Sequence, residues 1–219
     1  MEHEEIIQKT GAFAKQKLSG ESSGHDWWHV YRVWKTAVHI GAEEKADLFV
    51  VQLAALLHDI ADWKFNAGDE TAGPKLAEEW LNSLGVDKTI IKHVCEIIKD
   101  ISFKGAGTQS LMKTKEGMAV QDADRLDGIG AMGISRTFAY GGHVKRAIHD
   151  PNMAPEHHKT AEEYKAHAGK GTSINHFHEK LLLLKDRMNT NAGKKIAEQR
   201  HKFTESFLKE FLQEWDGKA

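Results

Sequence analysis

The chain has 219 residues, of which 40% are hydrophobic, enough for one sizeable core and short for two independent domains. Thirty Lys and Arg residues against 32 Asp and Glu residues leave a formal net charge of -2, which offers no basic field for duplex nucleic acid or anionic lipid. No stretch approaches the roughly 18 consecutive apolar residues of a membrane span, and the acidic N-terminus lacks the apolar region of a signal peptide. The single cysteine, Cys95, excludes an intramolecular disulfide, so we expect a cytoplasmic protein.

Apolar residues recur at helical spacing along the chain without sustained strand-type alternation, so we predict an all-α fold. The helix predicted over 25–39 ends at Gly41, and the helix predicted over 114–129 ends in the small-residue run GIGAMG. The helix over 46–57 is almost continuously apolar, and we expect it to be buried on most sides. The predicted helices cover 4–18, 25–39, 46–57, 74–84, 90–101, 114–129, 174–188 and 193–215.

Residues 141–173 are polar and carry two of the three prolines, Pro151 and Pro155, which predicts a long loop or lid. In the last helix, four aromatic residues at intervals of four are expected to face the core: Phe203, Phe207, Phe211 and Trp215. No linker marks a second domain. We therefore predict one domain over 1–219, with a core at about 20–130, a lid at about 141–173 and C-terminal helices at about 174–216.

The motif LLHDI places His58 and Asp59 together at the end of the buried helix. A buried, unpaired carboxylate is expensive, and a metal ion is one of the few partners that offsets the cost. Adjacent side chains on a helix diverge by about 100°, so both can reach one ion only near a helix end or bend. The dipeptide alone is a weak signal, because it also occurs by chance.

Two further segments strengthen the pattern. GHDWWHVYRV carries His29 with Arg32 three residues later and His25 one turn earlier. QDADRLD carries Asp124 and Asp127 three residues apart on another predicted helix. A histidine, a His-Asp pair and a later aspartate supply nitrogen and oxygen ligands for one divalent ion: Mn, Fe, Ni, Co, Zn or Mg.

These motifs resemble the consecutive signatures of the HD superfamily of metal-dependent phosphohydrolases: HxxRV around His29, LLHDI around His58 and Asp59, and DADRLD around Asp124. The segments GHDWWHVYRV, ISFKG, QDADRLDGIGAMGI and NHFHEKLLLLKDRMNT resemble the stand-alone bacterial branch of HD hydrolases, over nearly the whole chain. The resemblance implies a single-domain orthogonal helical bundle with one divalent metal ion held by His29, His58, Asp59 and Asp124.

The chain lacks several motifs of neighbouring HD branches, which narrows the expected metal site and substrate class. HD enzymes with two metals carry further histidines between the HD pair and the last aspartate, where this chain has only His93, so a mononuclear site is favoured. The GYP signature of cyclic-dinucleotide phosphodiesterases is absent. Alarmone hydrolases usually have a Glu-Asp pair shortly after the HD pair, where this chain has Ala61 and Asp62.

The resemblance implies a nucleotide substrate, and we expect hydrolysis of nucleoside triphosphates, including release of pyrophosphate, by a metal-activated water. Asp62 and Asp127 are the expected proton acceptors. His25 is a further catalytic candidate, although His25 and Asp26 can equally serve to cap the second helix. The candidates for phosphate binding, each of which is also explained as a solvated surface charge, are Arg32, Lys64, Lys104, Arg136, Arg146 and Lys180.

Two alternatives belong to other functional classes. A nucleotide-binding regulatory HD module would keep the fold and turn over poorly, whereas a dinuclear HD oxygenase would bind two irons with His93 as a ligand. The expected partner is a small-molecule nucleotide rather than a nucleic acid duplex or a membrane. The sequence leaves homo-oligomer formation, the native metal and the base preference open.

Overall fold

The computed structural model describes residues 1–19, 26–61, 69, 71–101, 112–156 and 171–218. Every regular element in these residues is helical, which confirms the all-α prediction. The chain groups into two compact units, 1–103 with 110–123, and 104–109 with 124–219. No helix within the described ranges is both long enough and apolar enough to cross a bilayer. The extent of the domain over 1–219 and its subdivision stay predictions.

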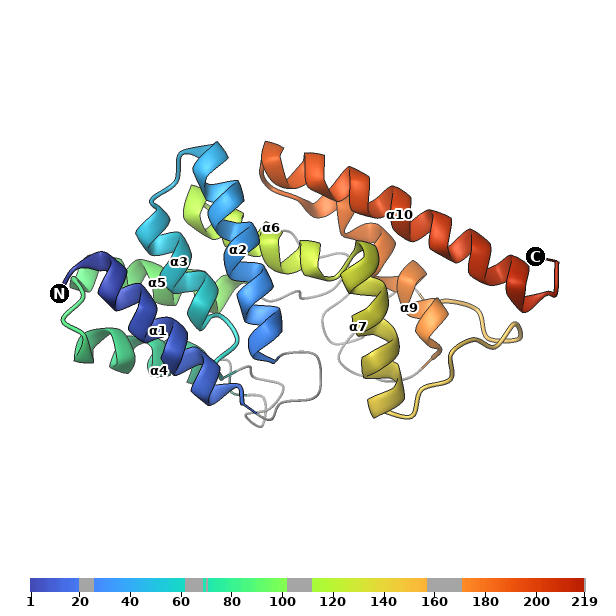
Figure 1. The fold of residues 1–219 in the computed structure, drawn as a ribbon, viewed down its shortest axis with the longest axis horizontal. Coiled ribbons are helices and arrows are strands. Elements are labelled where there is room, and N and C mark those ends of the chain that lie inside the picture. Colours follow the sequence, from blue (N-terminus) through green and yellow to red (C-terminus); the bar gives the residue numbers. More distant parts are fainter. Residues whose placement is uncertain (20–25, 62–68, 70, 102–111, 157–170, 219) are drawn as a thin grey trace. The chain divides into compact units, whose positions relative to one another are not determined.

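In the first unit, α3 (Leu48–Leu57) is the central helix (Figure 1). It contacts α1 (His3–Lys17), α2 (Trp27–Glu44) and α5 (Lys88–Asp100), and α4 (Ala72–Ser83) packs along α5. Eight of the ten residues of α3 are buried. The nearly continuous apolar sequence therefore forms a helix buried on most sides, as predicted.

Aspartate side chains cap the N-termini of α2, which carries His29, and of α3, which leads into His58 and Asp59. Asp26 accepts a hydrogen bond from the backbone N–H of His29 at 2.9 Å and so caps α2. Asp47 accepts one from the backbone N–H of Phe49 at 2.9 Å and caps α3. Caps of this kind typically contribute about 1 kcal/mol each. For Asp26, the capping interpretation is confirmed.

The second helix continues past Gly41, so the predicted end at this glycine is wrong. An added Cβ at Gly41 would lie 3.2 Å from side-chain atoms of Leu48 and Val51 on α3, tighter than ordinary van der Waals contact. The glycine therefore allows α2 and α3 to approach each other closely. The helix ends instead at Glu44, because Lys45 adopts the left-handed conformation with φ 56°.

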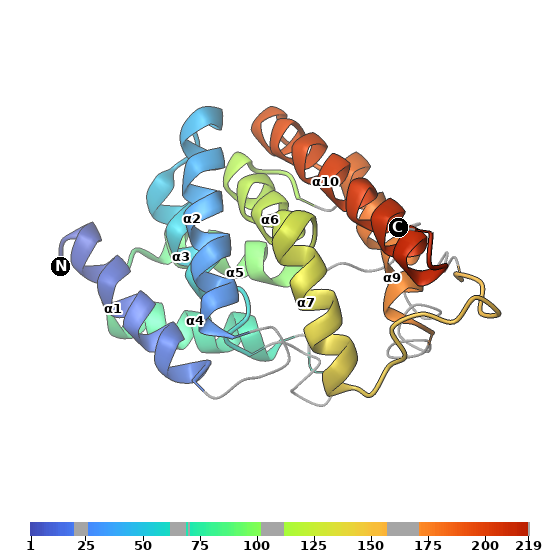
Figure 2. The same cartoon turned by 45° about the vertical axis from the view of Figure 1, so that its right-hand side comes forward.

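In the second unit, α10 (Asn191–Trp215) packs along α7 (Gly130–His143), and α7 contacts α9 (Ser173–Glu179) (Figures 1 and 2). The rings of Phe138, Phe177 and Phe207, one from each helix, lie with centroids 5.9 to 6.0 Å apart. These rings bring the three helices together around one aromatic cluster.

The aromatic stripe of α10 is only partly core, contrary to prediction. Phe207 and Phe211 are half-buried and contact each other with ring centroids 6.1 Å apart. Phe203 and Trp215, by contrast, are 54% and 48% exposed. A spacing of four residues advances about 400° around a helix, so the stripe crosses the helix surface over three repeats and only its two middle rings lie near the buried face.

The helix predicted over 114–129 is shorter, and a helix that was not predicted follows it. α6 (Lys115–Asp127) ends before Gly128, and α7 begins at Gly130, which has a positive φ of 73°. The run GIGAMG therefore forms the corner between two helices. Gly133 approaches Gly128 so closely that an added Cβ would overlap the Gly128 carbonyl, which explains why small residues stand here.

The helix predicted over 174–188 is also interrupted. α9 ends at Glu179, and Lys180, with φ -139° and ψ -57°, leads into two short 3-10 turns, Leu181–Leu183 and Lys185–Arg187. The predicted lid is trimmed at both ends, because α7 includes 141–143 and α9 begins at 173. Its residues 157–170 lie outside the described ranges, and its role as a lid stays a prediction.

Replacing Gly133 by Ala should lower the free energy of unfolding by about 1 to 3 kcal/mol, because the methyl group must displace the Gly128 carbonyl. Gly142→Ala is the matched control on the same helix, since a Cβ at Gly142 meets no atom within 4 Å. The control should leave stability unchanged or raise it by up to about 1 kcal/mol. Urea unfolding followed by circular dichroism measures both. Equal stability of the two variants would contradict the close approach at this corner.

Candidate metal centre

Three polar side chains meet where α2 passes the C-terminal end of α3. Nε2 of His29 lies 3.3 Å from Nε2 of His58 and 3.3 Å from Oδ2 of Asp59. Nε2 of His58 lies 3.5 Å from the same carboxylate oxygen. His58 and Asp59 can both face His29 because α3 ends at Leu57 and the chain turns at His58. The structure thus brings together three of the four predicted ligands.

The cluster is shielded from water. The His29 side chain is 0% exposed, and that of Asp59 is 10% exposed. Two imidazoles and a carboxylate so close together at low exposure favour a nearby positive charge, which a divalent metal ion would supply. Burial without such a charge would destabilise the end of α3.

The orientation of His58 suits a metal ligand. Its Nδ1 lies 2.8 Å from the carbonyl oxygen of Ala55, which can only accept, so Nδ1–H donates and Nε2 of the neutral ring carries a lone pair. A backbone acceptor behind the ring is the usual support of a metal-binding histidine. Ligand atoms about 2.1 Å from one ion lie about 3.0 Å apart in octahedral and about 3.4 Å apart in tetrahedral geometry. The observed separations of 3.3 to 3.5 Å therefore fit a shared divalent ion.

The two acidic residues of the third motif lie on α6. Asp124 is half-buried and belongs to the second unit, and its place as the fourth ligand stays a prediction. Asp127 is buried, and its Oδ2 accepts a hydrogen bond from Nη1 of Arg136 at 2.9 Å. This ion pair gives Arg136, a phosphate-binding candidate, a structural partner on the neighbouring helix. It also occupies one oxygen of Asp127, a predicted proton acceptor.

The remaining predicted residues divide between described and undescribed parts of the chain. Arg32 is half-buried on α2, three residues after His29. Four candidates lie outside the described residues: His25, Asp62, Lys64 and Lys104. Their predicted catalytic and phosphate-binding roles stay predictions.

Arg146 and Lys180 lie near one histidine of the second unit. Burial, with smaller contributions from the charges of Lys180 and Arg146, lowers the pKa of His176 to about 3. Nε of Arg146 is buried without a hydrogen-bond partner among the described residues, and the guanidinium lies 5.6 Å from the centre of the Tyr140 ring. Two cations beside a neutral imidazole make this a locally basic place. Sequence analysis did not identify His176 as their common neighbour.

His93 lies outside the three-residue cluster. Its Nε2 shares a hydrogen bond of 2.9 Å with Oγ1 of Thr114 and lies 3.9 Å from a carboxylate oxygen of Glu116, at the start of α6. The group of ligands that can share one ion in the described residues comprises His29, His58 and Asp59. This position of His93 disfavours the dinuclear alternative.

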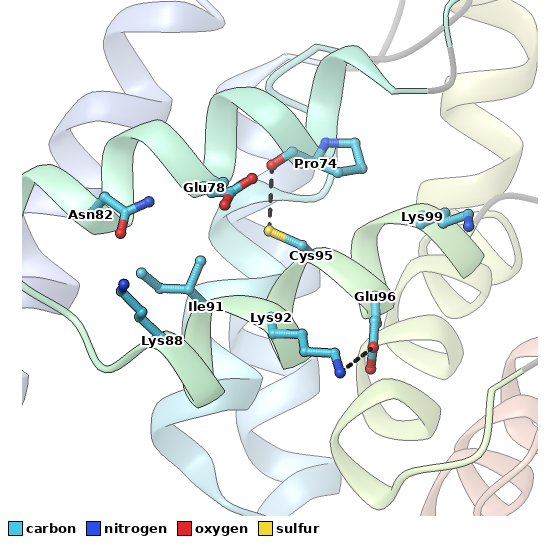
Figure 3. A pocket seen from close by; sticks show the side chains of 9 residues that line it. All are labelled: Pro74, Glu78, Asn82, Lys88, Ile91, Lys92, Cys95, Glu96 and Lys99. Atoms are coloured by element: carbon cyan, nitrogen blue, oxygen red, sulfur yellow. Dashed lines mark hydrogen bonds and ion pairs between the residues drawn. The ribbon is translucent and has the colours of Figure 1, made fainter.

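A cavity of about 480 Å³ lies between α4 and α5, and its lining includes none of the predicted site residues (Figure 3). The thiol of Cys95 donates a hydrogen bond to the Pro74 carbonyl oxygen at 3.3 Å. Burial, with smaller contributions from Glu78 and Glu96, raises the pKa of this thiol to about 11. The thiol therefore stays protonated near neutral pH and is a poor nucleophile.

Comparison with known proteins places these residues in a family context. The HD domain family model matches residues 27–129, a range that includes His29, His58, Asp59 and Asp124. The chain is 41% identical to the Bacillus subtilis protein YpgQ over 203 aligned residues. The alignment covers 91% of this chain and 89% of YpgQ. A crystal structure of YpgQ in complex with ADP matches with a TM-score of 0.75 and 32% identity over 97% of this chain and 100% of the other.

Two further crystal structures are similar over almost their whole length. An HD-superfamily hydrolase from Bacillus thuringiensis matches with a TM-score of 0.77 and 42% identity, covering 98% of this chain and 99% of the other. A protein from Lactobacillus plantarum matches with a TM-score of 0.86 and 36% identity, covering 99% and 100% respectively. Both units of the chain therefore have counterparts in these proteins.

Replacing Asp59 by Ala should reduce the bound divalent metal from about one equivalent per chain to near zero, because it removes the oxygen that both histidines face. Elemental analysis after gel filtration measures the content. Asp186→Ala, whose side chain is 80% exposed, is the matched control and should keep the metal. Full occupancy in Asp59→Ala would exclude this cluster as the centre. Two equivalents in the wild type would favour a dinuclear site.

His176 should make the stability of the protein depend on pH. Its folded pKa of about 3 lies below the ordinary value of 6.5, so the unfolded chain takes up the proton first as the pH falls. The stabilisation by the neutral ring is complete above about pH 6.5 and declines toward pH 3. His176→Gln cannot take up this proton, and should lose less unfolding free energy than the wild type between about pH 6.5 and pH 4. The exposed His39, replaced likewise, is the control, and an unchanged slope in His176→Gln would contradict the assignment.

Proposed function

Because the chain belongs to the HD-domain family, whose relatives include HD-superfamily hydrolases, we propose that it is a metal-dependent phosphohydrolase acting on nucleotides. Nucleoside triphosphates are the preferred substrates in this proposal, with release of pyrophosphate among the products. The convergence of His29, His58 and Asp59 carries the proposal, because these donors fit one divalent ion. The ADP bound by the similar protein YpgQ supports a nucleotide as the ligand.

The protein's part in the chemistry begins with holding the ion. His29, His58 and Asp59 would bind it, with Asp124 proposed as the fourth ligand. When bound, a divalent ion polarises a phosphoryl oxygen and activates water for attack at neutral pH. The Ala55 carbonyl would keep His58 in the tautomer whose Nε2 lone pair can bind the ion. The low exposure of the cluster strengthens each electrostatic interaction within it.

Other residues would manage the proton and the phosphate charge. We assign proton acceptance from the attacking water first to Asp62, and second to Asp127, one of whose oxygens is bound by Arg136. Arg32 follows His29 by three residues, so it would meet phosphate next to the ion. The further candidates keep their proposed roles: His25 in catalysis, and Lys64, Lys104, Arg146 and Lys180 in phosphate binding.

The alternative function is that of a regulatory module that binds nucleotides without hydrolysing them. Such a module would bind nucleotide at the same centre and release it unchanged. A module that only binds nucleotide does not need a metal position open to water, whereas three converging donors leave such a position on a bound ion. Enzymatic turnover is therefore the favoured function.

Purified protein with Mn²⁺ should hydrolyse one or more members of a panel of ribo- and deoxyribonucleoside triphosphates. Phosphorus NMR of the products identifies the bond that is broken, since pyrophosphate and orthophosphate give different signals. A chelator and Asp59→Ala should each reduce turnover by at least about 100-fold, more than the loss of a supporting residue typically causes. Stoichiometric nucleotide binding without products would instead establish the regulatory module.

A further inference from the structure

Trp28 differs from the other two tryptophans of α2. Trp27 is half-buried, and its ring lies 3.9 Å from where a Cβ of Gly11 on α1 would stand. Trp34 is half-buried and donates a hydrogen bond from Nε1 to Oε1 of Gln52 on α3 at 3.1 Å. Trp28 is 58% exposed. Two of the three rings therefore join helices, whereas the third faces solvent.

The described contact of Trp28 leaves part of its ring accessible. Its ring lies 5.9 Å from that of Tyr31 at an interplanar angle of 77°, an edge-to-face arrangement. Such a contact can cover at most one face of the indole. Tyr31 is itself flanked by Lys35, whose Nζ lies 5.7 Å from its ring centre. Trp28 is therefore a supported ring with an open aromatic surface.

The position of Trp28 relates this surface to the metal centre. It directly precedes His29, so the two side chains leave α2 at angles about 100° apart. Arg32 lies about 40° from Trp28 and about 60° from His29, one turn further along the helix, and so points between them. One helix thus presents an open aromatic ring, a guanidinium and a metal ligand in angular order.

We propose that Trp28 is a binding surface for the nucleobase of a nucleotide whose phosphates lie at the metal centre, an inference that rests on the proposed function. Aromatic side chains bind bases by stacking, and every base offers a π-face. Arg32 would contact the phosphates between the base and the ion. The strength of stacking depends on the size of the base's ring system and not on the hydrogen-bonding groups at its edge. The enzyme should therefore accept several bases and bind purines more tightly than pyrimidines.

The decisive experiment compares a substrate that has a base with one that has none. With Mn²⁺, Trp28→Ala should raise KM for ATP by about 5- to 100-fold, the range expected for the loss of one stacked base. KM for inorganic triphosphate should stay within about 2-fold of the wild type. Trp28→Phe should recover most of the ATP affinity, because it keeps an aromatic face.

Trp215→Ala is the matched control, since Trp215 is 48% exposed and belongs to the second unit. It should leave KM for both compounds unchanged. Equal effects of Trp28→Ala on ATP and inorganic triphosphate would show that the ring acts by positioning His29, which overturns the proposal. No effect on either compound would also overturn it.

Direct binding separates this inference from the proposed function. If the wild type binds ADP but hydrolyses no nucleotide, calorimetric titration of ADP into wild type, Trp28→Ala and Trp28→Phe still tests stacking, and the same order of affinities is expected. If the wild type binds no nucleotide, both proposals fail. If ADP binds the wild type and Trp28→Ala equally, only the role of Trp28 is wrong.

Discussion

The carboxylate of Asp59, held against two imidazoles at low exposure, is the constraint on which the structure around the site depends. It is delivered by α3, which is buried along its length and ends one residue before His58. It meets His29 because Gly41 lets α2 pack closely on α3. A divalent ion bound there would offset part of the cost of burying these polar groups, so its binding would also stabilise the α2–α3 pair.

The parts of this arrangement that could be predicted are those that depend on local sequence. The apolar run of α3 and the stripe of Ile91, Val94 and Ile97 on α5 define buried faces by periodicity, and these residues are buried. The convergence of His58 and Asp59 followed from their position at a helix end, where adjacent side chains can turn to one side. The third member, His29, was predicted from the order of a histidine, a His-Asp pair and a later aspartate, an order that also resembles that of a known family.

The parts that could not be predicted depend on contacts between distant residues. A glycine near a helix end signals termination, but Gly41 and Gly133 serve close approaches that only the packed structure reveals. The ion pair of Asp127 with Arg136 joins two helices across a corner that was expected to be the end of one. The sequence shows which charged residues are present at this corner but does not show which of them form ion pairs.

The consecutive residues Trp27, Trp28 and His29 show that one helix orients several side chains of the site at once. Consecutive residues on a helix point about 100° apart, so Trp27 packs near α1 while Trp28 faces outward and His29 faces the cluster. The rotation of the helix about its axis fixes all three directions together. That rotation is set by the buried face of α2, which includes Val30, Val33 and Ile40, and by the Gly41 contact with α3. A packing change that turned α2 would therefore move the metal ligand and the exposed ring at once, which makes the geometry of the site a property of one helix interface.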